Sequence, residues 1–277
     1  MKIHVLGHKG MLGRYVYTYL KSKHYDVTGL SRDDFDVTSY TDSELQMELY
    51  YKGYEKDDVV INCIGTIKPM VDKRGVLNAI EVNSLFPHIL ANACESEGYK
   101  MIHITSDCTF SGKDGSYNEK SLHDCTDVYG KTKSLGEPEN CTVVRTSIIG
   151  EEIETNRSLL EWIKSMKDKT ANGYINHHWN GLTCLSVAET FETIIFNNLY
   201  WKGVRHVFSP NILNKAEIIY AVSDAYGLNI SINAIEAPSK CDRTMTTIYN
   251  DIKFNIPTIE EQIQEQRDFY PILSEIY

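Results

Sequence analysis

The sequence predicts an α/β protein in which a doubly wound parallel sheet is joined to a smaller α/β cap on the C-terminal side. In the first half of the chain, short apolar strands alternate with segments of helical spacing. The strands are expected at residues 2–6, 26–30, 58–63, 100–105 and 141–146, and the main helices at 11–24, 74–97 and 127–137. Such alternation is typical of a parallel sheet with helices on both faces.

Three glycines, Gly7, Gly10 and Gly13, separate the first strand from the first helix. Glycine allows a positive φ and a close approach of a pyrophosphate to the main chain, while the helix N-terminus attracts the anion. The spacing G-x-x-G-x-x-G departs from G-x-G-x-x-G, and an ordinary glycine-rich turn would give the same pattern. Together with the strand and helix around it, the turn predicts a Rossmann-type dinucleotide site.

The second half of the chain follows a looser pattern. Helices are expected at 158–167, 187–198 and 215–226, and short strands at 205–208 and 230–234. We interpret residues 1–150 as a nucleotide-binding domain and residues 151–277 as a substrate-binding region, with a chain that can cross between the two. No Pro- or Ser-rich linker separates the two parts, so an extensive interface between them is expected.

Composition and charge exclude several classes of protein. The 277 residues, 42% of them hydrophobic, are enough for a large core, and the net charge of -10 argues against a nucleic-acid partner. No apolar run reaches the ~18 residues of a membrane span, and the first strand is too short for a signal peptide. A cytoplasmic location without membrane contact is therefore expected. Seven cysteines without a C-x-x-C pair argue against a disulfide framework and against a metal site.

Candidate catalytic residues begin at the end of the strand expected at 100–105. Ser106 follows this strand, where a hydroxyl points into the crevice that binds ligands in such sheets. Tyr129 and Lys133 stand four residues apart and so share one helix face. The lysine ammonium is expected to lower the pKa of the phenol from about 10 and to make Tyr129 a proton donor to a carbonyl. Alone, a Y-x-x-x-K pattern is more often a solvated helix face; Ser106 upstream favours the catalytic interpretation.

These residues, in this order, give the chain a family resemblance. It resembles the extended short-chain dehydrogenase/reductases and, among them, the dTDP-4-dehydrorhamnose reductase-like group, over nearly its whole length. The matching segments are the three glycines, residues 62–65, 82–83 and 104–107, the Tyr129/Lys133 pair, and residues 144–146 and 181–183. The resemblance implies that Ser106 polarises a substrate carbonyl and that Tyr129 donates the proton. It also implies that Lys133 lowers the tyrosine pKa and holds the nicotinamide ribose.

The same resemblance implies further ligand contacts. Cofactor contacts are expected from Gly7, Gly10, Met11, Leu12, Asn62, Cys63, Gly65, Tyr129 and Lys133, and substrate contacts from Asn83, Thr183 and Arg243. Arg243 stands where related reductases hold the substrate pyrophosphate, although an exposed surface arginine is an equally simple interpretation. Arg32, after the second strand, suits the 2′-phosphate of NADPH, and the adjacent Asp33 and Asp34 leave NADH open.

The chain departs from the simple reductases at Cys108. Where bacterial dTDP-sugar reductases typically have Thr-Asp-Tyr, this chain has Ser106-Asp107-Cys108, and residues 106 and 108 share one face of an extended segment. GDP-fucose synthase and the plant nucleotide-rhamnose synthase/epimerase-reductases place an epimerising cysteine here. Cys108 is therefore either that base or a buried cysteine at a strand end. An epimerase also needs a second acid/base, for which Lys164 and the His177/His178 pair are the candidates.

Three functions follow. The first is a bifunctional 3,5-epimerase/4-reductase that converts UDP-4-keto-6-deoxy-D-glucose to UDP-L-rhamnose with NADPH, supplied by an upstream nucleotide-sugar 4,6-dehydratase. The second is a plain dTDP-4-dehydrorhamnose reductase served by a separate epimerase. The third is a non-catalytic NADP-binding regulatory subunit, because the methionine adenosyltransferase regulatory protein looks like this group too. The intact Ser106/Tyr129/Lys133 set speaks against the third function, and Cys108 separates the first two. The resemblance also allows a homodimer.

Overall fold

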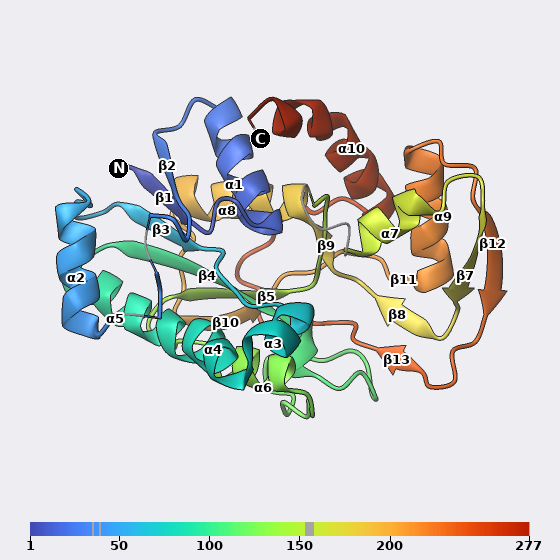
Figure 1. Ribbon diagram of the computed structural model, residues 1–277, viewed down its shortest axis with the longest axis horizontal. Helices are drawn as coiled ribbons and strands as arrows, with labels where there is room; N and C mark the ends of the chain where they lie inside the picture. The colour runs from blue at the N-terminus through green and yellow to red at the C-terminus, as the bar shows by residue number, and fades with distance from the viewer. Residues whose placement is uncertain (35, 39, 153–157, 277) are drawn as a thin grey trace.

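The computed structural model describes residues 1–34, 36–38, 40–152 and 158–276 (Figure 1). A six-stranded parallel sheet forms its centre, in the order β10-β5-β4-β3-β1-β2. The strands are β1 (Ile3–Leu6), β2 (Val27–Leu30), β3 (Val59–Asn62), β4 (Lys100–Ser106), β5 (Thr142–Thr146) and β10 (Gly203–His206). The order reverses between β1 and β3, so the predicted doubly wound parallel sheet is confirmed.

Helices cover both faces of this sheet (Figure 1). One face carries α1 (Met11–Ser22), α8 (Cys184–Phe196) and α10 (Ile259–Ile276), and the other α2 (Asp42–Tyr51), α5 (Phe86–Glu97) and α6 (Val128–Leu135). Tyr15 and Val16 of α1 are fully buried against Phe191 of α8, and Leu45 of α2 against Leu90 of α5. Burial of these apolar stripes on a sheet that is apolar on both faces is what fixes the layers.

The helix expected over 74–97 is divided in the structure. α3 (Lys68–Arg74) ends at Gly75, whose φ of 88° separates it from α4 (Val76–Ile80). A π-helical turn, Glu81–Leu85, then joins α4 to α5. Such turns are rare and concentrate near functional sites. This one carries Asn83, which is buried and donates from Nδ2 to Thr132 Oγ1 of α6 at 3.2 Å.

The predicted boundary at residue 150 does not coincide with the end of the lobe that holds the main sheet. β10 pairs in parallel with β5, and α8 packs against α1, although both elements follow residue 150. The strand that the sequence placed in the cap at 205–208 is therefore an edge strand of the main sheet. The chain crosses back after β9 (Leu182–Thr183), which pairs with β6 (Ile148–Ile149).

The smaller lobe lies beside one end of the main sheet (Figure 1). It is built from α7 (Leu159–Ser165), β7 (Thr170–Tyr174), β8 (His177–Trp179), β11 (Leu213–Asn214), α9 (Lys215–Ala225), β12 (Ser231–Ile235) and β13 (Cys241–Asp242). β11, β8 and β13 form a three-stranded sheet in that order, and β7 pairs with β12. The C-terminal α10 packs against α1 and α8 of the first lobe and α9 of the second. None of the helices among the described residues combines the length and apolarity needed to cross a membrane.

Candidate active site

A crevice of about 630 Å³ lies at the carboxyl ends of the central strands. Its walls bring together nine of the predicted site residues, namely Gly10, Met11, Leu12, Cys63, Gly65, Ser106, Cys108, Tyr129 and Lys133. In doubly wound sheets, ligands bind at this edge, where the strand order reverses. The volume lies within the range of small-molecule and cofactor pockets, roughly 300–1,000 Å³.

The glycine turn leaves the start of α1 open to an anion. Gly7 has a φ of 80°, and its N–H donates to the Leu30 carbonyl at 2.7 Å, which ties the turn to β2. A Cβ on Gly13 would overlap the Gly7 carbonyl, so only glycine lets α1 pack this close to the turn. Gly10 precedes α1 and offers no side-chain cap. The first N–H groups of α1 are thus free of a capping side chain and suit a diphosphate.

Ser106 and Cys108 meet at a short turn rather than along an extended segment. Ser106 ends β4 with a φ of -130°, and residues 107–109 form a single 3-10 turn. Ser106 Oγ caps this turn by accepting the Cys108 N–H at 3.1 Å, and it donates to Asp107 Oδ1 at 3.1 Å. The predicted extended geometry is therefore wrong, because the serine hydroxyl bends the chain. Both side chains still line the crevice.

Tyr129 reaches Ser106 because α6 packs directly on this turn. Asp127 begins the helix as its N-cap, accepting the Gly130 N–H at 3.0 Å. A Cβ on Gly130 would overlap the Cys108 carbonyl, so glycine permits the close approach. Tyr129 thus lies close to Ser106 at the crevice, and Lys133 lies one turn further along α6.

The expected effect of Lys133 on Tyr129 is wrong for this structure. Burial, with a smaller contribution from Cys108, raises the pKa of Tyr129, and the hydrogen bond with Ser106 only partly opposes it. Lys133 Nζ instead donates to the Ile104 carbonyl at 3.1 Å, and burial lowers the pKa of Lys133 to about 8. Sequence spacing showed the shared helix face but not the depth of burial. Tyr129 consequently stays protonated at neutral pH, as a proton donor must.

Cys108 is also a neutral group in this state. Burial, followed by the charge of Asp107, raises the pKa of Cys108 to about 12, while Arg243 and Ser106 act in the opposite direction.

Arg243 is partly buried, not a free surface arginine, and its Nε donates to the Phe110 carbonyl at 2.9 Å. Its guanidinium acts on the charges of both Cys108 and Asp107. Arg243 thus brings positive charge from the smaller lobe to the predicted catalytic turn.

A second hollow, of about 360 Å³, adjoins the glycine turn and holds Arg32. The acidic neighbours of Arg32 are engaged elsewhere: Asp33 pairs with Lys9 Nζ at 2.8 Å, and Asp34 accepts the Ser31 N–H at 2.7 Å. Arg74, at the end of α3, lines the same hollow. Burial and the charge of Arg32 lower the pKa of Arg74, so two guanidinium groups lie close together. No sequence pattern pointed to Arg74, which lies 42 positions from Arg32.

Two predicted substrate residues have structural tasks. Asn83 is 1% exposed, and its amide binds the N–H and carbonyl of Thr66 at 2.8 and 2.9 Å. Thr183 is equally buried and caps α8 by accepting the Ser186 N–H at 3.2 Å. Neither residue lines the crevice. Asn83 supports Thr66, which lines the crevice, and Thr183 supports the start of α8.

Neither Lys164 nor His178, the predicted partners of Cys108, lines the crevice. Lys164 Nζ pairs with Glu161 at 3.3 Å and lies over the rings of Tyr226 and Tyr270. His178 is exposed on β8. Both assignments relied on the folding of the smaller lobe, which sequence spacing could not give.

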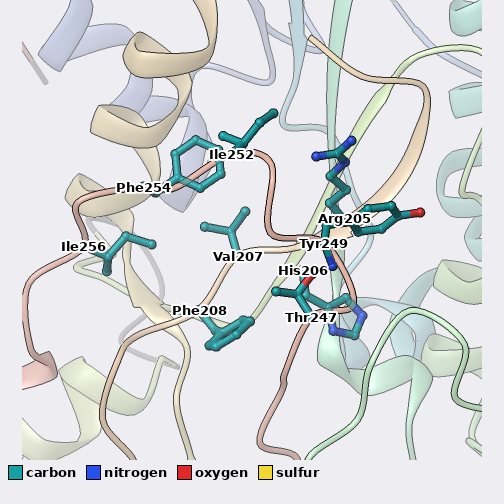
Figure 2. A pocket seen from close by; sticks show the side chains of 9 residues that line it. All are labelled: Arg205, His206, Val207, Phe208, Thr247, Tyr249, Ile252, Phe254 and Ile256. Atoms are coloured by element: carbon teal, nitrogen blue, oxygen red, sulfur yellow. Dashed lines mark hydrogen bonds between the residues drawn. The ribbon is translucent and has the colours of Figure 1, made fainter. Parts of the chain in front are cut away.

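A separate hollow of about 140 Å³ lies beyond the edge strand β10 (Figure 2). Apolar side chains, including Val207 and Phe254, gather on one side of it, and Arg205 stands on the other. Arg205 donates to Asp251 at 2.7 Å and stacks 4.3 Å from the Tyr249 ring. The volume is below that of ordinary ligand pockets, and the arginine is already engaged. The crevice is therefore the better candidate for the active site.

Residues 1–171 match a family model described as the RmlD substrate binding domain. The chain belongs to the RmlD family, that of the dTDP-4-dehydrorhamnose reductases. The extended α/β fold agrees with this assignment along the whole chain. The family resemblance and the reductase-like architecture that the sequence predicted are confirmed.

Known proteins similar to this RmlD-family chain include dTDP-sugar reductases and a subunit of methionine adenosyltransferase. A dTDP-4-dehydrorhamnose reductase from Clostridium acetobutylicum has a TM-score of 0.79 and 20% identity, covering 98% of this chain and 100% of the other. The reductase from Bacillus anthracis, solved in complex with NADP, has a TM-score of 0.79 and 16% identity, covering 97% and 99%. The bovine (Bos taurus) methionine adenosyltransferase 2 subunit beta is 24% identical over 250 residues, 82% of this chain and 72% of the relative.

Proposed function

We propose that this RmlD-family protein is a bifunctional enzyme that forms UDP-L-rhamnose from UDP-4-keto-6-deoxy-D-glucose. It inverts C3 and C5 of the sugar and reduces the C4 ketone with NADPH. The observation that carries the proposal is the meeting of Ser106, Cys108 and Tyr129 at one crevice, with Lys133 behind them. The substrate would come from a nucleotide-sugar 4,6-dehydratase, which creates the 4-keto-6-deoxy group.

The crevice and the second hollow fit an NADP cofactor. Free N–H groups at the start of α1 suit the pyrophosphate, and the paired Arg32 and Arg74 suit a 2′-phosphate. The related Bacillus anthracis structure contains NADP, which supports the same choice here. When bound, the cofactor supplies a hydride to the substrate carbonyl.

The reduction requires a carbonyl oxygen that is held and then protonated. Ser106 and Tyr129 both line the crevice and lie close together, so one substrate oxygen placed between the two hydroxyl groups can accept from both. Because burial keeps Tyr129 protonated, it gives its proton to the oxygen as negative charge develops there. Lys133, held by the Ile104 carbonyl, supplies positive charge on the same side.

The epimerisation uses the same polarised carbonyl. Protons on C3 and C5 flank C4, and hydrogen bonds to the C4 oxygen make them acidic. Cys108 stands next to Ser106 and would react as the thiolate. Burial and Asp107 raise the pKa of its thiol, and the nearby positive charge of Arg243 opposes that rise. One site therefore serves both ring carbons before the hydride is delivered.

Product analysis tests this function directly. Incubation with UDP-4-keto-6-deoxyglucose and NADPH, followed by NMR of the sugar, should give UDP-L-rhamnose. A sugar reduced at C4 without inversion at C3 and C5 would indicate the plain reductase.

The likeness to methionine adenosyltransferase 2 subunit beta favours a non-catalytic subunit as the alternative from another class. No NADPH oxidation with either UDP- or dTDP-linked substrate would support that alternative.

Replacement of Arg32 tests the choice of cofactor. Arg32→Ala should raise the KM for NADPH roughly 10- to 100-fold, the loss expected for a charge-assisted contact, and the KM for NADH far less. Initial rates at varied cofactor concentration measure both constants. Arg205→Ala, which removes an arginine at the separate hollow, is the matched control and should change neither. Equal effects of Arg32→Ala on the two cofactors would show that the phosphate binds elsewhere.

A further inference from the structure

A pocket of about 460 Å³ opens at the amino ends of β4, β5 and β10. The end of α5 and the chain around the start of each of these strands form its walls. Lys100 and Met101 of β4 line this pocket, whereas residues 104–106 of the same strand line the crevice at the other edge of the sheet. We call it the amino-end pocket. Its volume lies within the range of small-molecule sites, and it is separate from the candidate active site.

Much of the wall of the amino-end pocket is apolar. Tyr99, Met101 and Trp201 line it, and each of them is at most 8% exposed. Cys94 and Cys141 belong to the same wall. Burial raises the pKa of both thiols, so they stay neutral and behave as small apolar groups. A wall of rings and sulfur atoms favours a ligand with an apolar, ring-containing body.

One hydroxyl on this wall lacks a partner in the described part of the chain. The phenol oxygen of Tyr200 is enclosed, and no group among those residues hydrogen-bonds with it. Burial raises the pKa of Tyr200, so the phenol remains a hydrogen-bond donor at neutral pH. A buried donor without an acceptor is uncommon and calls for an explanation. In the wall of an open pocket, a ligand oxygen that accepts from the phenol supplies one.

The amino-end pocket also holds a lysine that no carboxylate neutralises within the described ranges. Lys100 Nζ lies over the ring of Tyr200, 5.7 Å from the ring centroid, and forms no ion pair there. The other charges of the pocket engage each other. Lys202 Nζ pairs with Glu95 at 2.6 Å, and Asn140 donates to the same carboxylate at 2.9 Å. Lys100 therefore leaves positive charge beside Tyr200, where an anion is favoured.

We propose that the amino-end pocket is a binding site for a small aromatic carboxylate. The carboxylate accepts from Lys100 Nζ and from the Tyr200 hydroxyl, and the aromatic ring packs against the apolar wall. A neutral aromatic molecule would leave Lys100 unpaired, and an inorganic anion would leave the apolar wall in water. The site is independent of the proposed function, because it lies at the edge of the sheet opposite to the crevice.

The acid 3-phenylpropionate and its neutral analogue 3-phenylpropionamide test the site, with saturation-transfer NMR on the full chain. The acid should bind saturably with a Kd of about 1 mM or below. The amide should bind at least about tenfold more weakly, because it lacks the charge-assisted contact. Saturating NADPH should not displace the acid, since the cofactor is expected in the crevice.

Two variants identify the groups that hold the acid. Lys100→Met should weaken its binding about 10- to 100-fold and leave that of the amide unchanged. Tyr200→Phe should weaken binding of the acid about 3- to 10-fold without lowering the melting temperature, because it removes a buried hydroxyl that no protein group satisfies. Lys164→Met is the matched control, since Lys164 is paired with Glu161 away from this pocket, and it should bind the acid as the parent does.

The opposite results would overturn the assignment. Equal affinity for acid and amide, or an unchanged affinity in Lys100→Met, would show that the ammonium does not hold the ligand. Displacement of the acid by NADPH would place it in the crevice. A lower melting temperature of Tyr200→Phe would show that the hydroxyl serves the fold. Absence of saturable binding at about ten times the expected Kd would show that the pocket takes no such acid.

Discussion

Tyr129→Phe should lose most of the reduction while it continues to bind NADPH. The substitution removes only the phenolic proton, and the ring still packs against the turn that carries Ser106 and Cys108. General acid catalysis of this kind contributes about 10²–10⁴-fold. Single-turnover oxidation of NADPH measures the chemical step, and fluorescence titration measures cofactor binding.

Tyr249→Phe is a suitable control for this variant. Tyr249 lies at the separate hollow beyond β10, where its ring stacks with Arg205 (Figure 2). Loss of the Tyr249 hydroxyl should leave both the rate of NADPH oxidation and the affinity for the cofactor unchanged. Reduction by Tyr129→Phe at the parent rate would show that another group protonates the substrate oxygen.

Cys108→Ala should separate the two halves of the proposed reaction. Exchange of the C3 or C5 proton with deuterated water should stop, and with it the formation of L-rhamnose, because no base remains on that face. Ser106, Tyr129 and Lys133 are untouched, so a 4-keto sugar that arrives already epimerised should still be reduced. Proton NMR of the sugar follows exchange, and NADPH absorbance follows reduction.

Two further variants sharpen this result. Cys108→Ser should also be poor, because a hydroxyl is a much weaker base than a thiolate near neutral pH. Cys125→Ala removes a cysteine that contacts α6 from outside the crevice and should keep both activities. If Cys108→Ala still takes deuterium into both carbons and makes rhamnose at the parent rate, Cys108 serves packing alone and the plain reductase is the better description.

Local patterns predicted the parts of the site that lie at strand ends. The glycine turn, Ser106 and the Tyr129/Lys133 pair each follow one strand or share one helix, and parallel strands bring their carboxyl ends to a common edge. Lys164 and His178 do not line the crevice, and their surroundings depend on how the smaller lobe packs. Arg74 gave no signal, since Arg32, the residue beside which it lies, is far away in the sequence.

Burial was the other quantity that spacing could not supply. Residues 129 and 133 share a helix face as expected, yet the electrostatic effect that was expected of that pairing did not follow. Burial of the phenol raises the pKa of Tyr129, and the ammonium of Lys133 donates to the Ile104 carbonyl instead. Similarly, the resemblance predicted that Asn83 contacts the substrate, but in the structure its amide is hydrogen-bonded to Thr66 from the π-helical turn.

During synthesis of the chain, β5 stays unpaired on one side until β10 has been made. β5 is an inner strand only because β10 pairs with it, and β10 is synthesised about sixty residues later. Until then, a nascent chain of the first 150 residues presents β5 as an unpaired edge, which invites association with other strands. A fragment cut at residue 150 would keep that open edge permanently. Expression of the lobe that holds the main sheet therefore requires a chain that extends through His206.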